Sequence, residues 1–211
     1  MRRILITVTL LGISGLIFSQ VDPGAIKTLD EFSAAAQSAP SVAIKFRLVN
    51  KDEQNEKSDT ATGYLLMSKD RYRLEMPDNI TWFNGSVSWD YLRKEKEVTI
   101  TRPGKKDDSF MSRPSSIFTV YKKGYKIRML EINDRDCVID LYPEDIKSDL
   151  VRIRMAVNKT SYALSGAEYR RKDGTSLILL VDDYSLKKVP DAGDFVFDRN
   201  RYRDAEINDM R

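Results

Sequence analysis

Residues 60–76 read TATGYLLMSKDRYRLEM, and the architecture of the whole chain can be inferred outward from this stretch. Tyr72, Leu74 and Met76 alternate with charged side chains, which is the period of two expected of a half-buried β-strand. The apolar run before them, residues 60–67, contains Gly63 and predicts a second strand. Because the two runs are separated by a short polar connector, they predict neighbouring antiparallel strands.

Runs with the same alternation continue on both sides of this pair. Asn84-Gly85, between two of them, is the strongest hairpin signal in the sequence. Short consecutive strands joined by tight turns favour an antiparallel, up-and-down sheet over a parallel α/β fold. We therefore expect a mainly β protein with about eleven strands in a single domain, residues 20–211. The further runs are residues 42–48, 80–83, 87–91, 98–101, 127–130, 137–142, 151–155, 162–170, 177–181 and 195–197.

Two segments depart from this alternation and predict helices. Asp22-Pro23 has the residue types of a helix start, apolar side chains follow at near-helical spacing, and Pro40 ends the run. Residues 104–123 begin with a charged turn, after which Ser112-Arg113-Pro114 would start a short helix. Three apolar side chains would share one face of that helix, namely Ile117, Phe118 and Tyr121.

The N-terminal segment has the composition of a secretory signal peptide. Met1-Arg2-Arg3 is basic, residues 4–18 are uncharged and mostly apolar, and Ser19 is a small residue suited to cleavage. The apolar run is shorter than the roughly 20 residues of a membrane span. We therefore expect residues 1–19 to be a signal peptide that is removed on export. An uncleaved N-terminal anchor is the alternative.

Composition excludes several classes of catalytic and metal site. The 211 residues contain no His and one Cys, Cys137. This excludes a Ser-His-Asp triad, a Cys-His pair, a His-ligated zinc, a zinc ribbon and an internal disulfide. The net charge is only +3, so we expect no nucleic-acid partner, because phosphate binding needs a net basic face.

The acidic clusters are best explained as solvated turns. They are Asp107-Asp108, Asp134 with Asp136, and Asp182-Asp183. Neighbours on a strand point to opposite faces, so Asp182 and Asp183 cannot face each other across a cleft as glycosidase carboxylates do. Asn133 to Asp136 resembles a fragment of a calcium loop but lacks its Gly and its closing Glu. We therefore expect no catalytic residue, no metal site and no cofactor.

With catalytic and metal sites excluded, the remaining candidate for a functional site is an apolar sheet face that is rich in aromatic residues and Met. It is either an ordinary core or a cavity for an apolar ligand, since barrels of this size can be filled or hollow. Met suits a surface that must fit varied partners, because its side chain is flexible and polarizable. Composition alone leaves both interpretations open. The candidate cavity residues are Ile44, Phe46, Leu48, Leu65, Met67, Tyr72, Leu74, Met76, Val87, Trp89 and Tyr91.

One ordered block resembles the periplasmic outer-membrane lipoprotein carrier protein family (LolA-like). The block is GYLLMSKDRYRLEMP at residues 63–77, followed by NGSVSWDY at residues 84–91. The family has a Gly-led strand, a Pro, an exposed Asp-Gly or Asn-Gly hairpin and a Leu-Trp-x-Tyr strand. The later matches are Leu141-Tyr142-Pro143, residues 194–197, Tyr202 and residues 206–209, so the resemblance spans nearly the whole mature chain.

The resemblance implies an incomplete antiparallel β-barrel of about eleven strands with a short-helix lid. It implies a periplasmic carrier, not an enzyme, that shields lipoprotein acyl chains in an apolar cavity between the inner and outer membranes. The implied partners are acylated lipoproteins, an inner-membrane lipoprotein-releasing transporter and an outer-membrane acceptor. The carrier itself would be a monomer.

The resemblance also implies a lid, made by the N-terminal helix and residues 108–122. In the family, a basic residue after the Gly-led strand latches this lid and is usually Arg followed by Pro. Here Lys69 and Asp70 occupy these positions, and Lys cannot make the planar, bidentate contacts of Arg. Either Lys69 forms a weaker latch or Arg71 takes the role. The implied lid residues are Phe32, Phe110, Met111, Ile117 and Phe118.

A second function stays open, which is a half-barrel module of the cell envelope that senses a lipid or a protein. An acyl chain of roughly 16 carbons costs on the order of 12 kcal/mol to expose to water, so a carrier needs a large apolar pocket that closes when empty. A solid core without space for chains would favour the sensing module. A carbohydrate-active enzyme would need two carboxylates facing each other across a cleft, which the sequence does not indicate.

Overall fold

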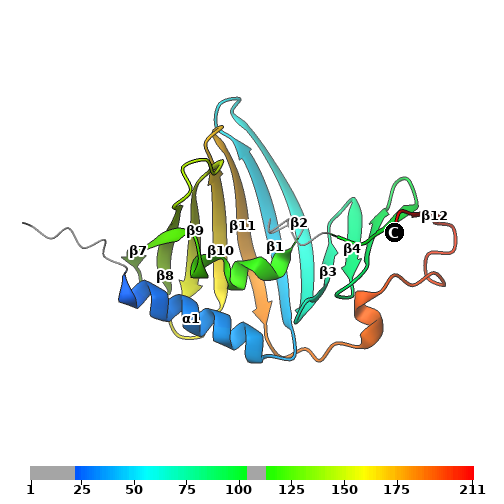
Figure 1. Ribbon diagram of the computed structural model, residues 1–211, viewed down its shortest axis with the longest axis horizontal. Coiled ribbons are helices and arrows are strands. Elements are labelled where there is room, and N and C mark those ends of the chain that lie inside the picture. The colour runs from blue at the N-terminus through cyan, green and yellow to red at the C-terminus, as the bar shows by residue number, and fades with distance from the viewer. Residues whose placement is uncertain (1–21, 104–112) are drawn as a thin grey trace, which may run out of the picture.

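One sheet organises the molecule (Figure 1). The computed structural model describes residues 22–103 and 113–211, so the expected signal peptide, Phe110 and Met111 lie outside the described residues. In this part of the chain, twelve strands form one open sheet in the order β12-β6-β5-β4-β3-β2-β1-β11-β10-β9-β8-β7. The mainly antiparallel, incompletely closed architecture predicted from the sequence is confirmed.

The strands pair antiparallel with their sheet neighbours, except for the parallel pair β12 and β6. Eleven of them overlap the alternating runs of the sequence. β12 was not predicted, and residues 195–197 do not form a strand. The bounds are β1 (Val42–Asp52), β2 (Lys57–Ser68), β3 (Arg71–Glu75), β4 (Asn79–Phe83), β5 (Ser88–Leu92), β6 (Glu97–Thr101), β7 (Tyr125–Ile132), β8 (Asp136–Pro143), β9 (Leu150–Asn158), β10 (Leu164–Arg171), β11 (Thr175–Ser185) and β12 (Glu206–Asp209).

The helix α1 (Pro23–Ser38) begins where the sequence predicts. Asp22 Oδ1 accepts hydrogen bonds from the backbone N–H groups of Gly24 (3.0 Å) and Ala25 (3.2 Å), which satisfies donors that the first turn leaves unpaired. The other carboxylate oxygen of Asp22 accepts from the backbone N–H of Met129 in β7, at 3.2 Å. The residue that starts the helix therefore also ties it to the edge of the sheet.

Two short 3₁₀ helices, η1 (Pro114–Phe118) and η2 (Val120–Lys122), lie on the same side of the sheet as α1 (Figure 1). The helix predicted to start near Pro114 is therefore present, as 3₁₀ turns. We call the sheet face beneath α1 and η1–η2 the inner face. Its buried side chains form one cluster with those of the helices. The cluster's members on β1–β3 and β7–β11 are Val42, Ile44, Phe46, Leu65, Met67, Tyr72, Leu74, Ile127, Ile139, Leu141, Ile153, Met155, Val157, Leu164, Ala167 and Leu179.

The C-terminal part of the chain covers the opposite, outer face. The 3₁₀ helix η3 (Ala192–Phe195) inserts Phe195 against Ala43 and Leu66. Further along, Phe197 and Tyr202 pack on the outer face of β4–β6. Figure 1 shows the orange and red C-terminal segment running beside these strands. The strands β1–β3 bury their apolar side chains on the inner face, whereas β4–β6 bury theirs on the outer face. The pairing of β3 with β4 explains this change, because Leu74 of the inner face lies opposite Thr81, which puts Ile80 and Trp82 on the outer face.

Candidate functional site

The inner face gathers eight of the eleven predicted cavity residues. Five are fully or nearly fully buried core residues on β1–β3, and Tyr72 lies among them with its ring 5.5 Å from that of Phe83. Leu48 and Met76 are partly buried and pack against the same cluster. The residues brought together are Ile44, Phe46, Leu48, Leu65, Met67, Tyr72, Leu74 and Met76.

The other three predicted cavity residues do not join this face. Tyr91 is buried on the outer face, where its ring centroid lies 4.7 Å from that of Tyr202, and Trp89 packs against the same outer cluster. Val87 is half-buried in the connection between β4 and β5. The prediction that they line the inner face is therefore wrong for Trp89 and Tyr91. Alternation puts them on one side of their strand, and the pairing of Trp82 with Trp89 determines that this is the outer side.

A glycine makes the inner face compact. A Cβ atom added to Gly63 would lie 2.3 Å from Cζ of Phe46 and 2.9 Å from Sδ of Met76. The ring of Phe46 therefore lies directly over the backbone of the neighbouring strand β2. This is the physical reason for a Gly at the start of the apolar part of residues 60–76.

The described members of the predicted lid cover this face. Phe32 of α1 and Phe118 of η1 are both buried, with ring centroids 5.0 Å apart, and Ile117 is fully buried beside them. The hydroxyl of Tyr121 in η2 donates to Asp30 of α1 at 2.6 Å. Sequence reasoning assigned Tyr121 to the apolar face but missed this polar contact, because the partner is 91 positions away.

The two predicted latch residues lie on different sides of the sheet. The guanidinium of Arg71 lies over the ring of Phe195, 4.8 Å from its centroid, so the Arg71 side chain is directed to the outer face. Its contact nearest the lid is with the Ser68 hydroxyl at 3.5 Å, and a latch role for either residue stays a prediction. Lys69 lies in the turn between β2 and β3 with a positive φ of 55° and lines a pocket beside the lid. Arg71 is directed outward because its neighbour Tyr72 points inward.

That pocket has a volume of about 890 Å³ and lies where the end of α1, the ends of β1 and β2, and η1–η2 meet. Pockets for small molecules and cofactors commonly measure about 300–1,000 Å³. Four of its lining side chains, Ala36, Val42, Met67 and Phe118, also belong to the inner-face cluster. The pocket floor is therefore continuous with the buried apolar interior.

The end of α1 is held in place next to this pocket. Ser68 at the end of β2 donates its hydroxyl to the carbonyl of Pro40 at 2.9 Å. Ser41 donates to the carbonyl of Lys188 at 2.5 Å. The contacts of Asp22 and Ser68 therefore tie the two ends of the helix to the sheet, and the contact of Ser41 ties the start of β1 to the segment after β11. Nothing in the local sequence predicts these contacts, because each joins distant segments.

Two tyrosines bring hydroxyls into the interior. Tyr169 and Tyr184 both pack against the inner-face cluster, and burial raises the pKa of each above its ordinary value. The hydroxyl oxygen of Tyr184 is buried and has no hydrogen-bond partner among the described residues. An unpaired buried hydroxyl costs about 1–3 kcal/mol, so this group can gain a hydrogen bond if a ligand carbonyl enters.

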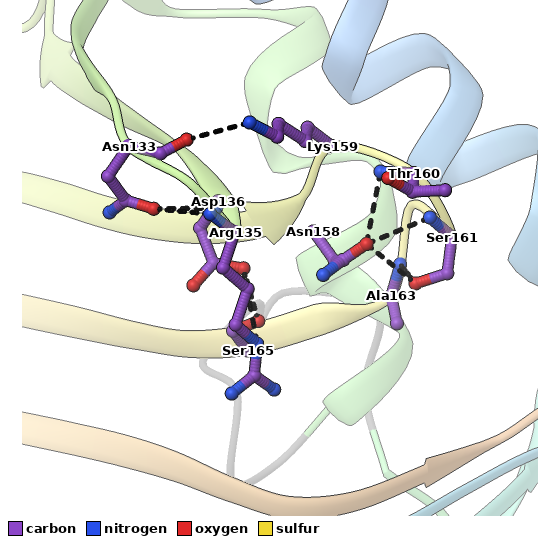
Figure 2. Close-up of polar contacts among 9 residues, drawn as sticks. All are labelled: Asn133, Arg135, Asp136, Asn158, Lys159, Thr160, Ser161, Ala163 and Ser165. Atoms are coloured by element: carbon purple, nitrogen blue, oxygen red, sulfur yellow. Dashed lines mark hydrogen bonds and ion pairs between the residues drawn. The ribbon is translucent and has the colours of Figure 1, made fainter.

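Of the acidic clusters, Asp134 with Asp136 lies at a turn, as predicted, whereas Asp182-Asp183 lies within strand β11 and not in a turn. Figure 2 shows that Asn133 caps its turn by accepting from the backbone N–H groups of Arg135 (3.0 Å) and Asp136 (2.7 Å). Ser165 donates to the carboxylate of Asp136 at 2.7 Å. Asp182 pairs with Arg47 at 3.0 Å. Asp107-Asp108 lies outside the described residues. Within residues 22–103 and 113–211, no group of three or more Asp, Glu or Cys side chains is placed to hold a metal ion.

No helix in the described part of the chain is both long enough and apolar enough to cross a membrane.

The fold has counterparts among solved structures. An uncharacterized conserved protein from Thermus thermophilus superimposes with a TM-score of 0.58 at 10% identity, covering 89% of this chain and 99% of that one. A LolA superfamily protein from Nitrosomonas europaea gives a TM-score of 0.42 at 13% identity, covering 82% and 97%. The Mycobacterium tuberculosis lipoprotein LppX gives 0.41 at 14%, covering 80% and 98%. The Thermus likeness establishes a shared fold.

No curated protein sequence matches the chain. A family model does, and its description is "Outer membrane lipoprotein carrier protein LolA". The match runs over residues 18–173, which include α1, η1–η2 and all strands from β1 to β10. It therefore covers the pocket and almost all of the inner face. On this evidence, the chain belongs to the outer membrane lipoprotein carrier protein LolA family.

Proposed function

We propose that this protein is a periplasmic carrier that shields the acyl chains of lipoproteins between the inner and outer membranes. The observation that carries the proposal is an apolar inner face that the sheet does not close by itself. It is covered by α1 and by two 3₁₀ helices, and a pocket of about 890 Å³ opens beside them. Membership of the LolA family supports the same function and an envelope location.

The buried interior is what an empty carrier requires. Each acyl CH₂ transferred from water into an apolar site contributes about 0.8 kcal/mol. The same apolar surface, if it stayed open to water without cargo, would promote aggregation. A carrier therefore has to fill its own cavity when it is empty. Here Phe32, Ile117 and Phe118 fill it from the lid side.

The cover that moves in this proposal is η1–η2. The helix α1 is bonded to the sheet at both ends, through Asp22 and through the carbonyl of Pro40. The η1–η2 segment instead contributes buried apolar side chains and the Tyr121 hydroxyl to its contact with α1. Apolar contacts are non-directional, so an acyl chain can replace them.

The proposal extends to the rest of the pathway. Residues 1–19 would be removed as a signal peptide, and residues 20–211 would act as one domain and as a monomer. An inner-membrane lipoprotein-releasing transporter would load it, and an outer-membrane acceptor would receive the cargo. Such a protein works by binding and needs no catalytic group or cofactor.

The first test is native mass spectrometry, with lipid extraction, on protein isolated from its own envelope. We expect acylated polypeptide bound at about one per chain, by the same burial argument. A protein that carries no lipid, and that takes up no fluorescent fatty acid, would contradict the carrier function.

A pair of Leu-to-Glu variants locates the site. Leu74 is buried on the inner face, whereas Leu180 is exposed on the outer face of β11, opposite Arg47. Leu74→Glu places a charge in the apolar interior and should abolish loading, while Leu180→Glu should load normally. Circular dichroism checks that both variants keep the folded sheet. Should Leu74→Glu fail to fold, Met76→Glu, at a partly buried position of the same face, replaces it.

The alternative function, a lipid- or protein-sensing module of the cell envelope, is favoured by one observation. Several inner-face side chains have no exposed surface at all, among them Leu65, Ile139 and Met155. If this packing never opens, the inner face is simply a core. Copurification with a folded partner protein, without lipid, would support this function.

A further inference from the structure

The pocket beside η1–η2 has a basic rim above an apolar floor. Its floor is formed by buried side chains of the inner-face cluster, including Val42, Met67 and Phe118. Its lining also contains four cationic side chains and, among the described residues, a single carboxylate, that of Asp70. The cations are Lys69, Arg113, Lys122 and Lys123.

These cations come from three separate parts of the chain. Lys69 is in the turn between β2 and β3, Arg113 precedes η1, and Lys122 and Lys123 lie at the end of η2. All four residues are exposed. The fold, rather than a single charged run of sequence, brings these positive charges to one opening.

The rim has more cations than carboxylates among its described lining residues. Several cations on the sheet are paired with carboxylates, as in the ion pairs Arg152–Glu168 (2.8 Å) and Arg154–Asp140 (2.7 Å). At the pocket, no ion pair joins Lys69, Lys122 or Lys123 to a carboxylate of residues 22–103 and 113–211. Like charges gathered at one site repel one another, and an anion placed among them relieves this repulsion.

We propose that this pocket binds an anionic amphiphile. Its acyl chain lies on Val42, Met67 and Phe118, and its phosphate or carboxylate head lies among Lys69, Lys122 and Lys123. This inference rests on the proposed carrier function and adds a preference in the ligand class, because an apolar floor alone would take neutral and charged lipids equally. Hydroxyls of Ser115, Ser116 and Thr119 line the same opening and can donate to the head.

The experiment compares two fluorescent probes with the same acyl chain, one a fatty acid and one the corresponding fatty alcohol. The carboxylate head can accept charge-assisted hydrogen bonds that the alcohol cannot match, so the fatty acid should bind up to about tenfold more tightly. The preference should shrink at high salt, because the rim is exposed to solvent.

The double variant Lys122→Gln/Lys123→Gln should lose most of this preference while binding the alcohol as the wild type does. Its matched control is Lys57→Gln/Lys94→Gln, which makes the same change of net charge at exposed positions outside the pocket lining and should keep the preference. Lys69 is left unchanged because its positive φ makes substitution there harder to interpret.

Each outcome has one meaning. Equal binding of both probes by the wild type overturns the inference and leaves the carrier function standing, whereas binding of neither probe contradicts the carrier function itself. If inorganic phosphate displaces the fatty acid but not the fatty alcohol, the charged head is the group that the pocket recognises, which supports the inference. If the double variant loses cosedimentation with vesicles of anionic phospholipid but keeps its probe preference, the rim is a membrane contact and the inference is wrong.

Discussion

Each face of the sheet carries a short 3₁₀ segment as part of its cover, and the two segments are held in different ways. On the outer face, η3 has a capping box formed by Asp191 and Asp194, and Asp194 also pairs with Arg73 of β3 at 3.0 Å. On the inner face, η1 has no side-chain hydrogen bond at its start and contributes buried apolar residues. Directional bonds hold the outer cover, whereas mainly non-directional contacts hold the inner one.

This difference indicates which cover can move. The outer cover continues into β12, whose backbone pairs with β6, so lifting it would break a strand pairing and leave polar groups unpaired. Lifting η1–η2 exposes mainly apolar surface, which an acyl chain can cover again. In the proposed carrier, the outer cover would therefore stay fixed, and the inner cover, η1–η2, would be the one that cargo replaces.

The largest effects on stability should come from large-to-small substitutions of side chains buried between the sheet and each cover. Trp82→Ala on the outer face and Ile117→Ala in η1 should each lower the free energy of unfolding by about 2–5 kcal/mol, since both side chains are buried. Only Ile117→Ala should also speed the uptake of a fluorescent fatty acid, because it weakens the closed state. Denaturant titration and stopped-flow fluorescence measure the two effects. Faster uptake by Trp82→Ala would show that the covers are not independent.

A smaller effect on stability is expected from replacing Gly63 with Ala, and Gly193 provides the matched control. Gly63→Ala brings a Cβ atom within 2.3 Å of the Phe46 ring, and such overpacking costs about 1–3 kcal/mol. Gly193→Ala in η3 meets nothing within 4 Å and should change stability by less than about 0.5 kcal/mol. Thermal unfolding measures both. Equal melting temperatures for the two variants would mean that the inner face is looser than its geometry indicates.

Much of the fold could be predicted from the sequence because alternation is a local property. Residues 71–76 predict a strand, and β3 occupies Arg71–Glu75 with Tyr72 and Leu74 buried, while Asp22 caps α1 as its residue type predicts. Local pattern also determines which residues share a side of one strand. That is why the inner-face residues of β1–β3 were correctly grouped.

The features that could not be predicted from the sequence depend on how separate segments are placed relative to one another. Trp89 and Tyr91 alternate like Tyr72 and Leu74, but whether two strands turn the same side to one face depends on the register of their pairing. β12 has no buried side chain and no alternation, so nothing in residues 206–209 predicted its pairing with β6. The basic rim of the pocket was missed for a similar reason, because only the fold brings its three segments together.

A modest effect is expected from removing the hydroxyl that joins the replaceable cover to α1. Tyr121→Phe deletes the hydrogen bond to Asp30 and keeps the ring, so it should cost about 0.5–1.5 kcal/mol of stability. It should also speed uptake of the fatty-acid probe, though less than Ile117→Ala does. The matched control is Tyr142→Phe, which deletes a 2.9 Å hydrogen bond to Asp140 of β8 and should not change uptake.

The smallest and most selective effect is on pH dependence. Burial and the hydrogen bond to Asp30 raise the pKa of Tyr121 from 10.0 to about 12, because a phenolate would lie in an apolar site beside a carboxylate. The neutral hydroxyl therefore contributes its full stabilisation below pH 10, and the contribution is lost as the pH rises through about 12. Ser33 also bonds to this hydroxyl, and Lys122 lies 5.9 Å from the centroid of the ring.

Comparison with Tyr121→Phe isolates this group, because burial also raises the pKa of Tyr125, Tyr169 and Tyr184 in both proteins. At pH 8 the wild type should be the more stable of the two, and the difference should shrink between pH 10 and 12. Uptake of the fatty-acid probe by the wild type should approach that of the variant over the same interval. A stability difference that stays constant up to pH 12 would mean that the hydroxyl is open to water, and η1–η2 would then be held to α1 by its apolar side chains alone.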